Sequence, residues 1–481
     1  MVVVVVSVWF GVFLNLKIDS RREGCLMDLL TKTWKGENIK AVIKLSDKIE
    51  YIVYTNKENN NSNNFIKELK FENSEGNNSV NPLGVAVSNS ISLQVYDEDD
   101  ALSPMNTASK YYGLTVNGVE IDLFIEYEEG VWSPYGIYFT TYWGGSYSDG
   151  GHGLVNISAD DKLNTLGALD LPDVPAFAGV EAGNLIAYVM YGLGLSDSQF
   201  KIDPSINTTL EYGIVQGTKV RDFLNNICQI LMARVIVDRE GVIKFVPALG
   251  VYVDGNSLEI TSEESGTLVN KNNNNINYSK VRVKYLEAGE TSFETLFSDN
   301  SHVLNEGLNV ITDINVRFRA LSYDNVTVLF NSTEQGANIN SISWRGYQNG
   351  IQLNVNVTGG AISECRITGE GTAVSTVDRY IEKSIENSTS FGGTTFLFDT
   401  QQMMSKSKAE ALGEQLKIYI KTVQRNVIMS GCALTPKLNI GDKLIIKDTG
   451  TLYDGIYKVV GQSLTFGEDY NMDLTLIRLE V

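Results

Sequence analysis

The stretch that decides the fold covers residues 88–163 and reads SNSISLQVYDEDDALSPMNTASKYYGLTVNGVEIDLFIEYEEGVWSPYGIYFTTYWGGSYSDGGHGLVNISADDKL. Apolar residues alternate with other residues over 91–95 and again over 119–125, which is the period-two pattern of half-buried strands. Asn117-Gly118 precedes the second run, and both residue types tolerate the positive φ angles of a type I′ hairpin turn. The stretch therefore predicts a β meander. Its numerous acidic and aromatic residues match no spacing of a known catalytic or metal site.

The composition is that of a folded protein with several domains. At 481 residues the chain is long enough for about three or four of them. Hydrophobic residues make up 43% of the chain, which argues against a disordered protein, and 43 Gly against 8 Pro favour many turns between strands. A net charge of −19 argues against a nucleic-acid-binding surface, because affinity for phosphates comes largely from Lys and Arg. The same charge also fits plain solubility.

The four cysteines predict a protein made in a reducing compartment. Cys25, Cys228, Cys365 and Cys432 lie far apart and form no C-x-x-C motif. Cys228 falls on the apolar side of a predicted helix. We therefore expect buried, reduced, structural thiols.

The N-terminal residues 1–16, MVVVVVSVWFGVFLNL, are strongly apolar. They are fewer than the roughly 20 that a membrane-spanning helix needs, and their basic residues follow them, unlike those of a signal peptide. Three interpretations remain: a translation start placed too early, with Met27 as the working start; an extra strand; or a weak membrane anchor. The first is favoured because ordinary amphipathic strand patterning begins only after Met27.

Helical patterns interrupt the strands in two places. Residues 180–195 and 219–233 carry apolar side chains at helical spacing, and a hairpin follows around 238–241. A third helix is predicted over 407–423, where Ser407 and Glu410 match a capping box. We predict five segments: an apolar N-terminal extension (1–26), a first β domain (27–165), an α/β insert (166–257), a second β domain (258–375), and a helix with a closing β sheet (376–481).

The closing segment carries a family resemblance. Gly441-Asp442 before a strand, the strand GIYKVV (455–460) and a final strand over 472–478 resemble the closing domain of bacteriophage tail hub proteins. The segments FIKELKF (65–71), NPLG (81–84), ISLQV (91–95), DALSP (100–104) and YGIYF (135–139) resemble the first tube-forming β domain of that family. VNISAD (155–160), two helices and the VDREG hairpin (237–241) resemble its inserted domain. Their order over most of the chain carries the resemblance, and residues before Met27 lie outside it.

The resemblance implies a structural role. It implies an α+β, mostly β fold with two tube-forming β-barrel-like domains, an inserted small α/β domain and a closing β domain. It also implies a homotrimer whose pseudo-hexameric ring joins the tail tube and distal tail proteins to a spike or fibre protein. DNA would pass through the ring without specific binding, and the acidic charge fits a lumen that repels phosphates. The protein would be made in the bacterial host cytoplasm and lie in the virion tail, with the host cell surface as a further partner.

Three groups of residues could carry chemistry instead. The acidic run 97–100 offers hard oxygen ligands for Ca²⁺ but lacks the spacing of an EF-hand loop, so a solvated turn is favoured. His152 and His302 are the only histidines, which argues against a serine hydrolase or a zinc peptidase. A glycosidase needs only two carboxylates, and 58 acidic residues leave that class open.

The aromatic run over 132–147 either binds sugars or forms core and subunit interface, and the second interpretation is favoured because strands are required there. Three functions therefore remain: a non-enzymatic tail hub, a glycan- or receptor-binding adhesin, and a tail-associated cell-wall hydrolase. The hub is preferred, with no catalytic, cofactor-binding or metal-ligating residue assigned.

Overall fold

The computed structural model describes residues 38–55, 64–74, 88–128, 130–147, 153–172, 174, 178–212, 219–250, 255, 257–261, 267–270, 278–316, 320–330, 336–346, 350–385, 394–423, 426–430, 438–447, 453–466 and 471–479. The apolar extension 1–26, the NPLG segment, His152, Cys25 and Cys432 therefore lie outside the described residues.

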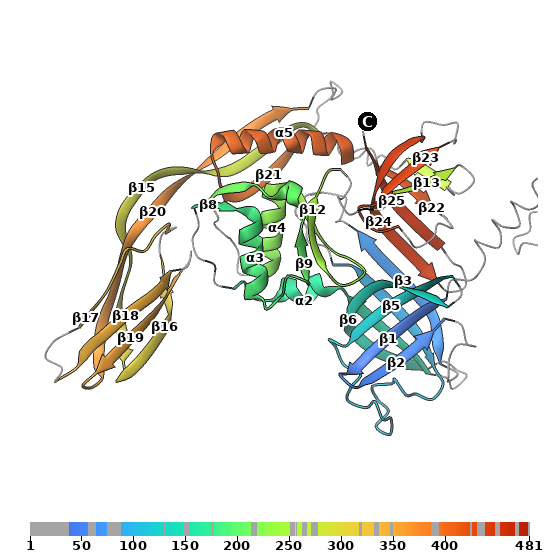
Figure 1. Ribbon diagram of the computed structural model, residues 1–481, viewed down its shortest axis with the longest axis horizontal. Helices are drawn as coiled ribbons and strands as arrows, with labels where there is room; N and C mark the ends of the chain where they lie inside the picture. The colour runs from blue at the N-terminus through green and yellow to red at the C-terminus, as the bar shows by residue number, and fades with distance from the viewer. Residues whose placement is uncertain are drawn as a thin grey trace, which may run out of the picture.

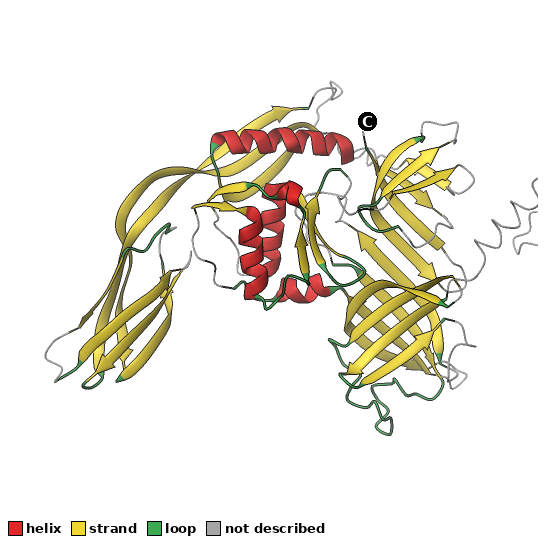
Figure 2. Cartoon of the chain, in the orientation of Figure 1, coloured by secondary structure: helices red, strands yellow, loops and turns green. Residues whose placement is uncertain are grey.

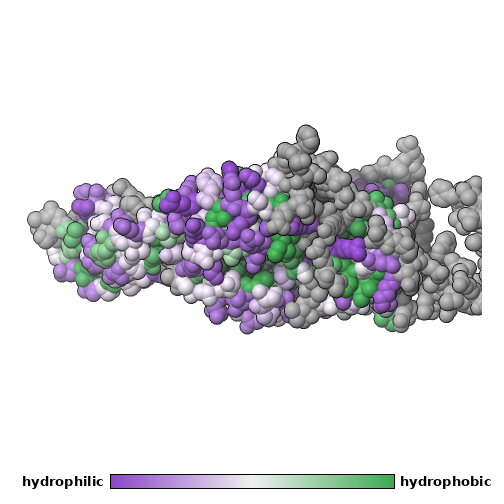
Figure 3. Space-filling view, turned by 90° about the horizontal axis from the view of Figure 1, so that it is seen from above, coloured by the Kyte–Doolittle hydropathy of each residue, from purple (hydrophilic) through white to green (hydrophobic). Residues whose placement is uncertain are grey.

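The molecule is elongated and mostly β (Figure 1). Strands occupy both ends, and the helices gather in the middle (Figure 2). The predicted α+β, mostly β class is confirmed. Seen from above, polar residues cover much of the surface, with small apolar patches set among them (Figure 3).

The first β unit is a curled, barrel-like sheet. Its strands are β1 (Ile39–Ser46), β2 (Ile49–Tyr54), β3 (Phe65–Ser74), β4 (Ser90–Asp97), β5 (Glu120–Glu128), β6 (Val131–Tyr147) and β7 (Gly153–Asp160). They pair in the order β3-β4-β7-β6-β5-β1-β2, and β2 lies against β3, so the sheet curls back on itself. Ile121, Leu123 and Ile125 of β5 are fully buried, as the alternating pattern predicts.

The hairpin predicted at Asn117-Gly118 is wrong. Gly118 has a φ of +87°, but Asn117 is not among the described non-glycine residues with positive φ, and a type I′ turn needs both. Strand β5 also pairs with β1 and β6 rather than with β4. The sequence signal was correct only for the positive φ of Gly118. It could not identify the strands that pair with β5, because distant segments decide that pairing.

The closing β unit extends the same sheet. It comprises β13 (Ser257–Thr261), β14 (Thr267–Asn270), β22 (Asn426–Ser430), β23 (Lys443–Lys447), β24 (Gly455–Phe466) and β25 (Asn471–Arg478). Strand β24 pairs with β23, with β25 and, beyond its middle, with β3 of the first unit. The two units thus form one 13-stranded sheet.

The α/β insert lies between the two ends of the molecule (Figure 1). Its elements are α2 (Lys162–Ala168), β8 (Ala178–Glu181), α3 (Ala182–Gly192), β9 (Phe200–Ile202), the 3₁₀ helix η2 (Pro204–Ile206), β10 (Thr209–Tyr212), α4 (Val220–Leu231), β11 (Ala233–Val237) and β12 (Ile243–Pro247). Two predicted helices and the hairpin after them are confirmed as α3, α4 and β11–β12. Apolar faces of the helices and strands form a separate core.

Two very long strands build an arm. Its elements are β15 (Tyr278–Leu304), β16 (Gly307–Asn315), β17 (Asn325–Phe330), β18 (Asn338–Gly346), β19 (Gly350–Thr358), β20 (Ile362–Ser384), β21 (Thr394–Met403) and α5 (Lys406–Val423). The near half of the arm packs under α5, and the far half forms a lobe in which β16, β19 and β18 make a second sheet. The near and far halves have separate hydrophobic cores.

Helix α5 is confirmed, but its predicted cap is wrong. The helix begins at Lys406, and the hydroxyl of Ser405, not Ser407, accepts a hydrogen bond from the Lys408 amide at 3.3 Å. The Ser405 amide donates to the Glu211 carboxylate at 2.5 Å. A distant strand therefore supplies the acidic partner that a local capping box would take from within the helix.

Candidate functional site: a shared sheet and the joint beside it

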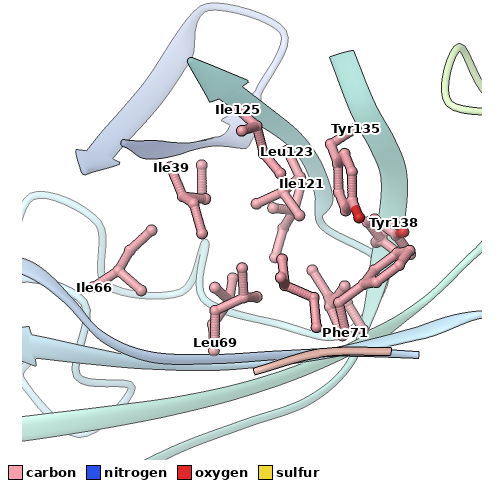
Figure 4. Packing of buried hydrophobic residues seen from close by; sticks show 14 of the residues in the cluster. Ile39, Ile66, Leu69, Phe71, Ile121, Leu123, Ile125, Tyr135 and Tyr138 are labelled. Atoms are coloured by element: carbon pink, nitrogen blue, oxygen red, sulfur yellow. The ribbon is translucent and has the colours of Figure 1, made fainter. Parts of the chain in front are cut away.

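The two β units share one hydrophobic core. Leu464 of β24 lies opposite Phe71 of β3, and both side chains are buried. Figure 4 shows Phe71 packed among Leu69, Tyr135 and Tyr138, with side chains from several strands pointing toward one another. Each fully buried aliphatic or aromatic side chain contributes about 1.5–3 kcal/mol. The cluster extends without a break from β1 to β25, so the two units are built to hold a fixed relative position.

A hairpin turn of the insert fastens onto this shared sheet. Arg239, between β11 and β12, places its guanidinium 4.4 Å from the centre of the Tyr135 ring in β6. Its Nη2 donates to the carbonyl of Leu438, before β23, at 2.7 Å. One side chain thus contacts the first β unit and the closing unit together. Gly241 in the same turn has a φ of +78° and lies against Ile137.

Asp161 forms the joint between the first β unit and the insert. Its carboxylate accepts hydrogen bonds at 2.9 Å from the Asn89 amide, the Ser88 hydroxyl and the Leu163 amide, the last of which caps α2. Burial raises the pKa of Asp161 to about 6, although these donors act in the opposite direction. Burial also raises the pKa of the neighbouring Tyr138 hydroxyl well above its usual value.

Two buried cations fasten the insert to the rest of the chain. Arg234 of β11 donates a hydrogen bond to the Tyr419 hydroxyl of α5. Lys458 of β24, 1% exposed, donates to the carbonyls of Ala248 at 3.3 Å and Pro247 at 3.4 Å. A buried charge is costly unless it is hydrogen-bonded, so these contacts favour the observed placement of the insert against α5 and against β24. These contacts therefore form a joint that links the insert to the closing unit and to helix α5 of the arm.

A cleft of about 210 Å³ opens between β10, α4 and α5. Its walls mix the apolar side chains of Leu210, Met403 and Leu412 with Glu211 and Lys408. Glu211 is already engaged by the Ser405 amide. The cleft therefore separates the insert from the arm without presenting a set of converging reactive groups.

The acidic run 97–100 is a structural turn. Asp97 is fully buried and accepts hydrogen bonds from the Leu102 amide at 2.8 Å, the Ala101 amide at 3.1 Å and the Asn64 side chain at 3.0 Å. Desolvation by burial raises the pKa of Asp97. The preference for a turn over a metal site agrees with this geometry, because the carboxylate organises the loop backbone. The expectation that the turn is solvated is wrong for Asp97, which is buried, and holds for Glu98 and Asp99, which are exposed. In the part of the chain that the structure describes, no group of three His, Cys, Asp or Glu could hold a metal ion.

Three side chains of the aromatic run belong to the core. Tyr135, Tyr138 and Trp143 are almost fully buried, and the Trp143 indole donates to the Leu102 carbonyl at 3.0 Å. Among the described side chains of the run, Tyr142 is 57% exposed, and Trp132 and Phe139 are half-buried. The favoured interpretation as core residues is therefore confirmed for Tyr135, Tyr138 and Trp143.

His302 lies in the lobe of the arm, where its Nε2 contacts the Asp299 carboxylate at 3.1 Å. Cys365 lies opposite it in the strand register, but this thiol is 2% exposed within the apolar core of the lobe. No substrate could reach a nucleophile placed there. Cys228 is also buried, and burial raises the pKa of its thiol to about 12.

No family model matches the sequence, and no curated protein matches it closely enough to be counted as a relative. The fold does match solved structures. A 43 kDa tail protein of prophage MuSo2 from Shewanella oneidensis superposes with a TM-score of 0.50 and 10% identity, over 91% of this chain and 98% of that one. The chain has the fold of a prophage tail protein. The predicted resemblance to tail hub proteins is confirmed at the level of the fold.

Two further tail proteins are similar. One, from Neisseria meningitidis MC58, gives a TM-score of 0.48 at 8% identity, over 92% of this chain and 97% of that chain. The prophage tail protein gp18 from Listeria monocytogenes EGD-e gives a TM-score of 0.43 at 9% identity, over 91% of this chain and 94% of that chain.

None of the helices in the described part of the chain is long and apolar enough to cross a membrane.

Proposed function

We propose that the chain is a structural hub of a phage or prophage-derived tail tip. It would assemble as a homotrimer, join the tail tube and distal tail proteins to a spike or fibre, and lie in the virion tail after synthesis in the host cytoplasm. The observation that carries the proposal is the fold shared with a prophage tail protein over nearly the whole of both chains. A shared fold alone does not give a function, so the geometry of the shared sheet has to support it.

The shared sheet suggests which parts form the ring. We assign the two tube-forming units to β1–β7 and to the closing strands β13, β14 and β22–β25. This differs from the predicted second β domain at 258–375, most of which lies in the arm. The support is that β24 pairs directly with β3 and that one core spans both units. Two fixed, curled units in each chain would give six positions around the axis of a trimer. The predicted segment boundaries stay predictions.

The charge of the chain supports passage of DNA without binding. With 58 acidic and 39 basic residues, the surface carries excess negative charge that repels phosphates. The proposal requires this excess to include the inner wall of the ring. A neutral or basic inner wall in an assembled ring would contradict this account of the charge while leaving the hub assignment in place.

The proposed role is not enzymatic. The residues that could have carried chemistry have structural roles. Cys365 is packed in a core, Asp161 caps α2, and Asp97 holds the backbone of a turn. A hydrolase would need two carboxylates or a nucleophile facing a substrate-sized cleft. Peptidoglycan incubated with the purified protein should therefore release no soluble fragments. Release of fragments that depends on one or two carboxylates would contradict the proposal.

Deletion of the gene from its phage or prophage tests the proposal directly. Particles made without the protein should lack a closed tail tip, and wild-type protein supplied in trans should restore it. The Cys228→Ser variant is a matched control, because it changes a buried thiol that has no place in the proposed ring contacts. Normal, infectious tails made without the chain would refute the structural role.

A further inference from the structure

The outward face of the lobe of the arm has an unusual composition. Strand β19 is the middle strand of the sheet β16-β19-β18, and its side chains alternate between the core and solvent. Ile351, Leu353, Val355 and Val357 are buried, so Asn354 and Asn356 point to the opposite, outward face. Asn is unfavourable in strands, and elsewhere in this chain runs of it occur in predicted loops such as 56–64 and 270–277. Asn also occurs in other strands of this chain, as in Asn156 of β7 and Asn309 of β16, so what distinguishes Asn354 and Asn356 is the surroundings of their amides.

The strand register arranges the neighbours of these two amides in repeating rows. Asn356 lies between Leu308 of β16 and Ser341 of β18, and Asn354 lies between Val310 and Ser343. Neighbouring strands are about 5 Å apart and successive rows about 7 Å apart. Each row thus presents an aliphatic group, an amide and a hydroxyl in the same order. Neither row contains a carboxylate, in a chain with 58 acidic residues.

These side chains are available to a ligand. Leu308 is 71% exposed and Val310 is 54% exposed, and both serines are exposed. The described structure gives the side chains of Asn354 and Asn356 no hydrogen-bond partner. By contrast, the outward amides of Gln94 and Asn156 in β4 and β7 bond to each other at 3.0 Å. The Gln94–Asn156 pair is satisfied internally, whereas the amides of the lobe keep their donors and acceptors for solvent or a partner.

We propose that the outward face of β16, β19 and β18 binds an uncharged glycan chain. Amides and hydroxyls both donate and accept hydrogen bonds, as sugar hydroxyls do, and aliphatic groups pack against the C–H surfaces of a sugar ring. The absence of carboxylates and ammonium groups from the two rows matches a neutral polymer and not a polyanion. The long strands of the arm hold this face away from the shared sheet (Figure 1). Arg345, at the end of β18, donates to the Tyr188 hydroxyl of α3 and so links the lobe to the insert.

A glycan array tests this inference. The labelled full-length protein is applied to immobilised neutral homopolymers of glucose, galactose, mannose, rhamnose and N-acetylglucosamine, and to polygalacturonate and heparin as anionic polymers. We expect retention on at least one neutral polymer. The double variant Asn354→Ala, Asn356→Ala should weaken that retention about tenfold, because two hydrogen-bonding groups are lost. The matched control Gln94→Ala, Asn156→Ala removes two outward amides from another sheet and should leave retention unchanged.

Hydrogen exchange locates the bound polymer and checks folding. The retained polymer should slow exchange in β16, β18 and β19, and the unbound double variant should exchange like the wild type in the buried strands of the lobe. Retention only on anionic polymers, retention on none, or equal retention by the double variant would overturn the inference. None of these outcomes bears on the hub assignment, because the lobe lies outside the proposed ring.

Discussion

The core shared by the two β units predicts that one substitution disturbs both of them. Leu464 of β24 is 1% exposed and lies opposite Phe71 of β3. Replacing a buried Leu by Ala removes its transfer free energy and leaves a cavity, which together cost about 3 kcal/mol. That change raises the population of locally opened states about a hundredfold. We therefore expect Leu464→Ala to speed amide exchange in β25 of the closing unit and in β3 and β4 of the first unit.

The matched control is Leu353→Ala, in the separate core of the lobe. Leu353 is 0% exposed, so the cost is of the same size, but its neighbours belong to β15–β20. Hydrogen exchange measured by mass spectrometry should show faster exchange in the arm alone for this variant. If Leu464→Ala sped exchange only in β23–β25 and left β3 and β4 as in the wild type, the two units would be independent and the reasoning would fail.

Further variants test the joint and the buried groups. Arg239→Ala removes the contact with Tyr135 and the Leu438 carbonyl, and should raise exchange in the β11–β12 turn and near Leu438; unchanged exchange at both would contradict the joint. The pKa of Asp161 in the folded state, about 6, lies above its usual 3.8, so its ionisation weakens the fold. The unfolding free energy should then fall by up to about 3 kcal/mol as pH rises from about 4 to 7, and Asp161→Ser should flatten that slope in thermal melts. Native Cys228 should resist thiol reagents at pH 8, because burial raises its pKa to about 12, and peptide mapping that found it modified would refute its burial.

The sequence predicted local structure where a periodic pattern continued for several residues. Alternation over 91–95 and 119–125 predicted β4 and β5, and helical spacing predicted α3, α4 and α5. These signals are local, because burial on one face sets the period of the side chains. These local signals could not predict that β24 pairs with β3, because the sequence of a strand does not indicate which distant strand it pairs with.

The arm shows a second reason for missed structure. Val281 and Val283 alternate with Arg282 and Lys284, but this pattern marks only a short part of β15, which runs from Tyr278 to Leu304. Irregularities in its pairing with β20, such as the one between Ala288 and Thr291, shift which face each side chain occupies. A period-two pattern is lost at each shift, so the strand reads as several pieces. The rows around Asn354 and Asn356 were missed because each row combines residues of three separate strands.

The oligomeric state tests the central claim most directly. Mass photometry of the purified chain, followed by electron microscopy of the dominant species, measures both subunit number and symmetry. The hub proposal predicts a threefold ring with a central channel wide enough for duplex DNA, and with the shared sheets facing that channel. A stable monomer at high protein concentration, or a closed assembly without a channel, would contradict it.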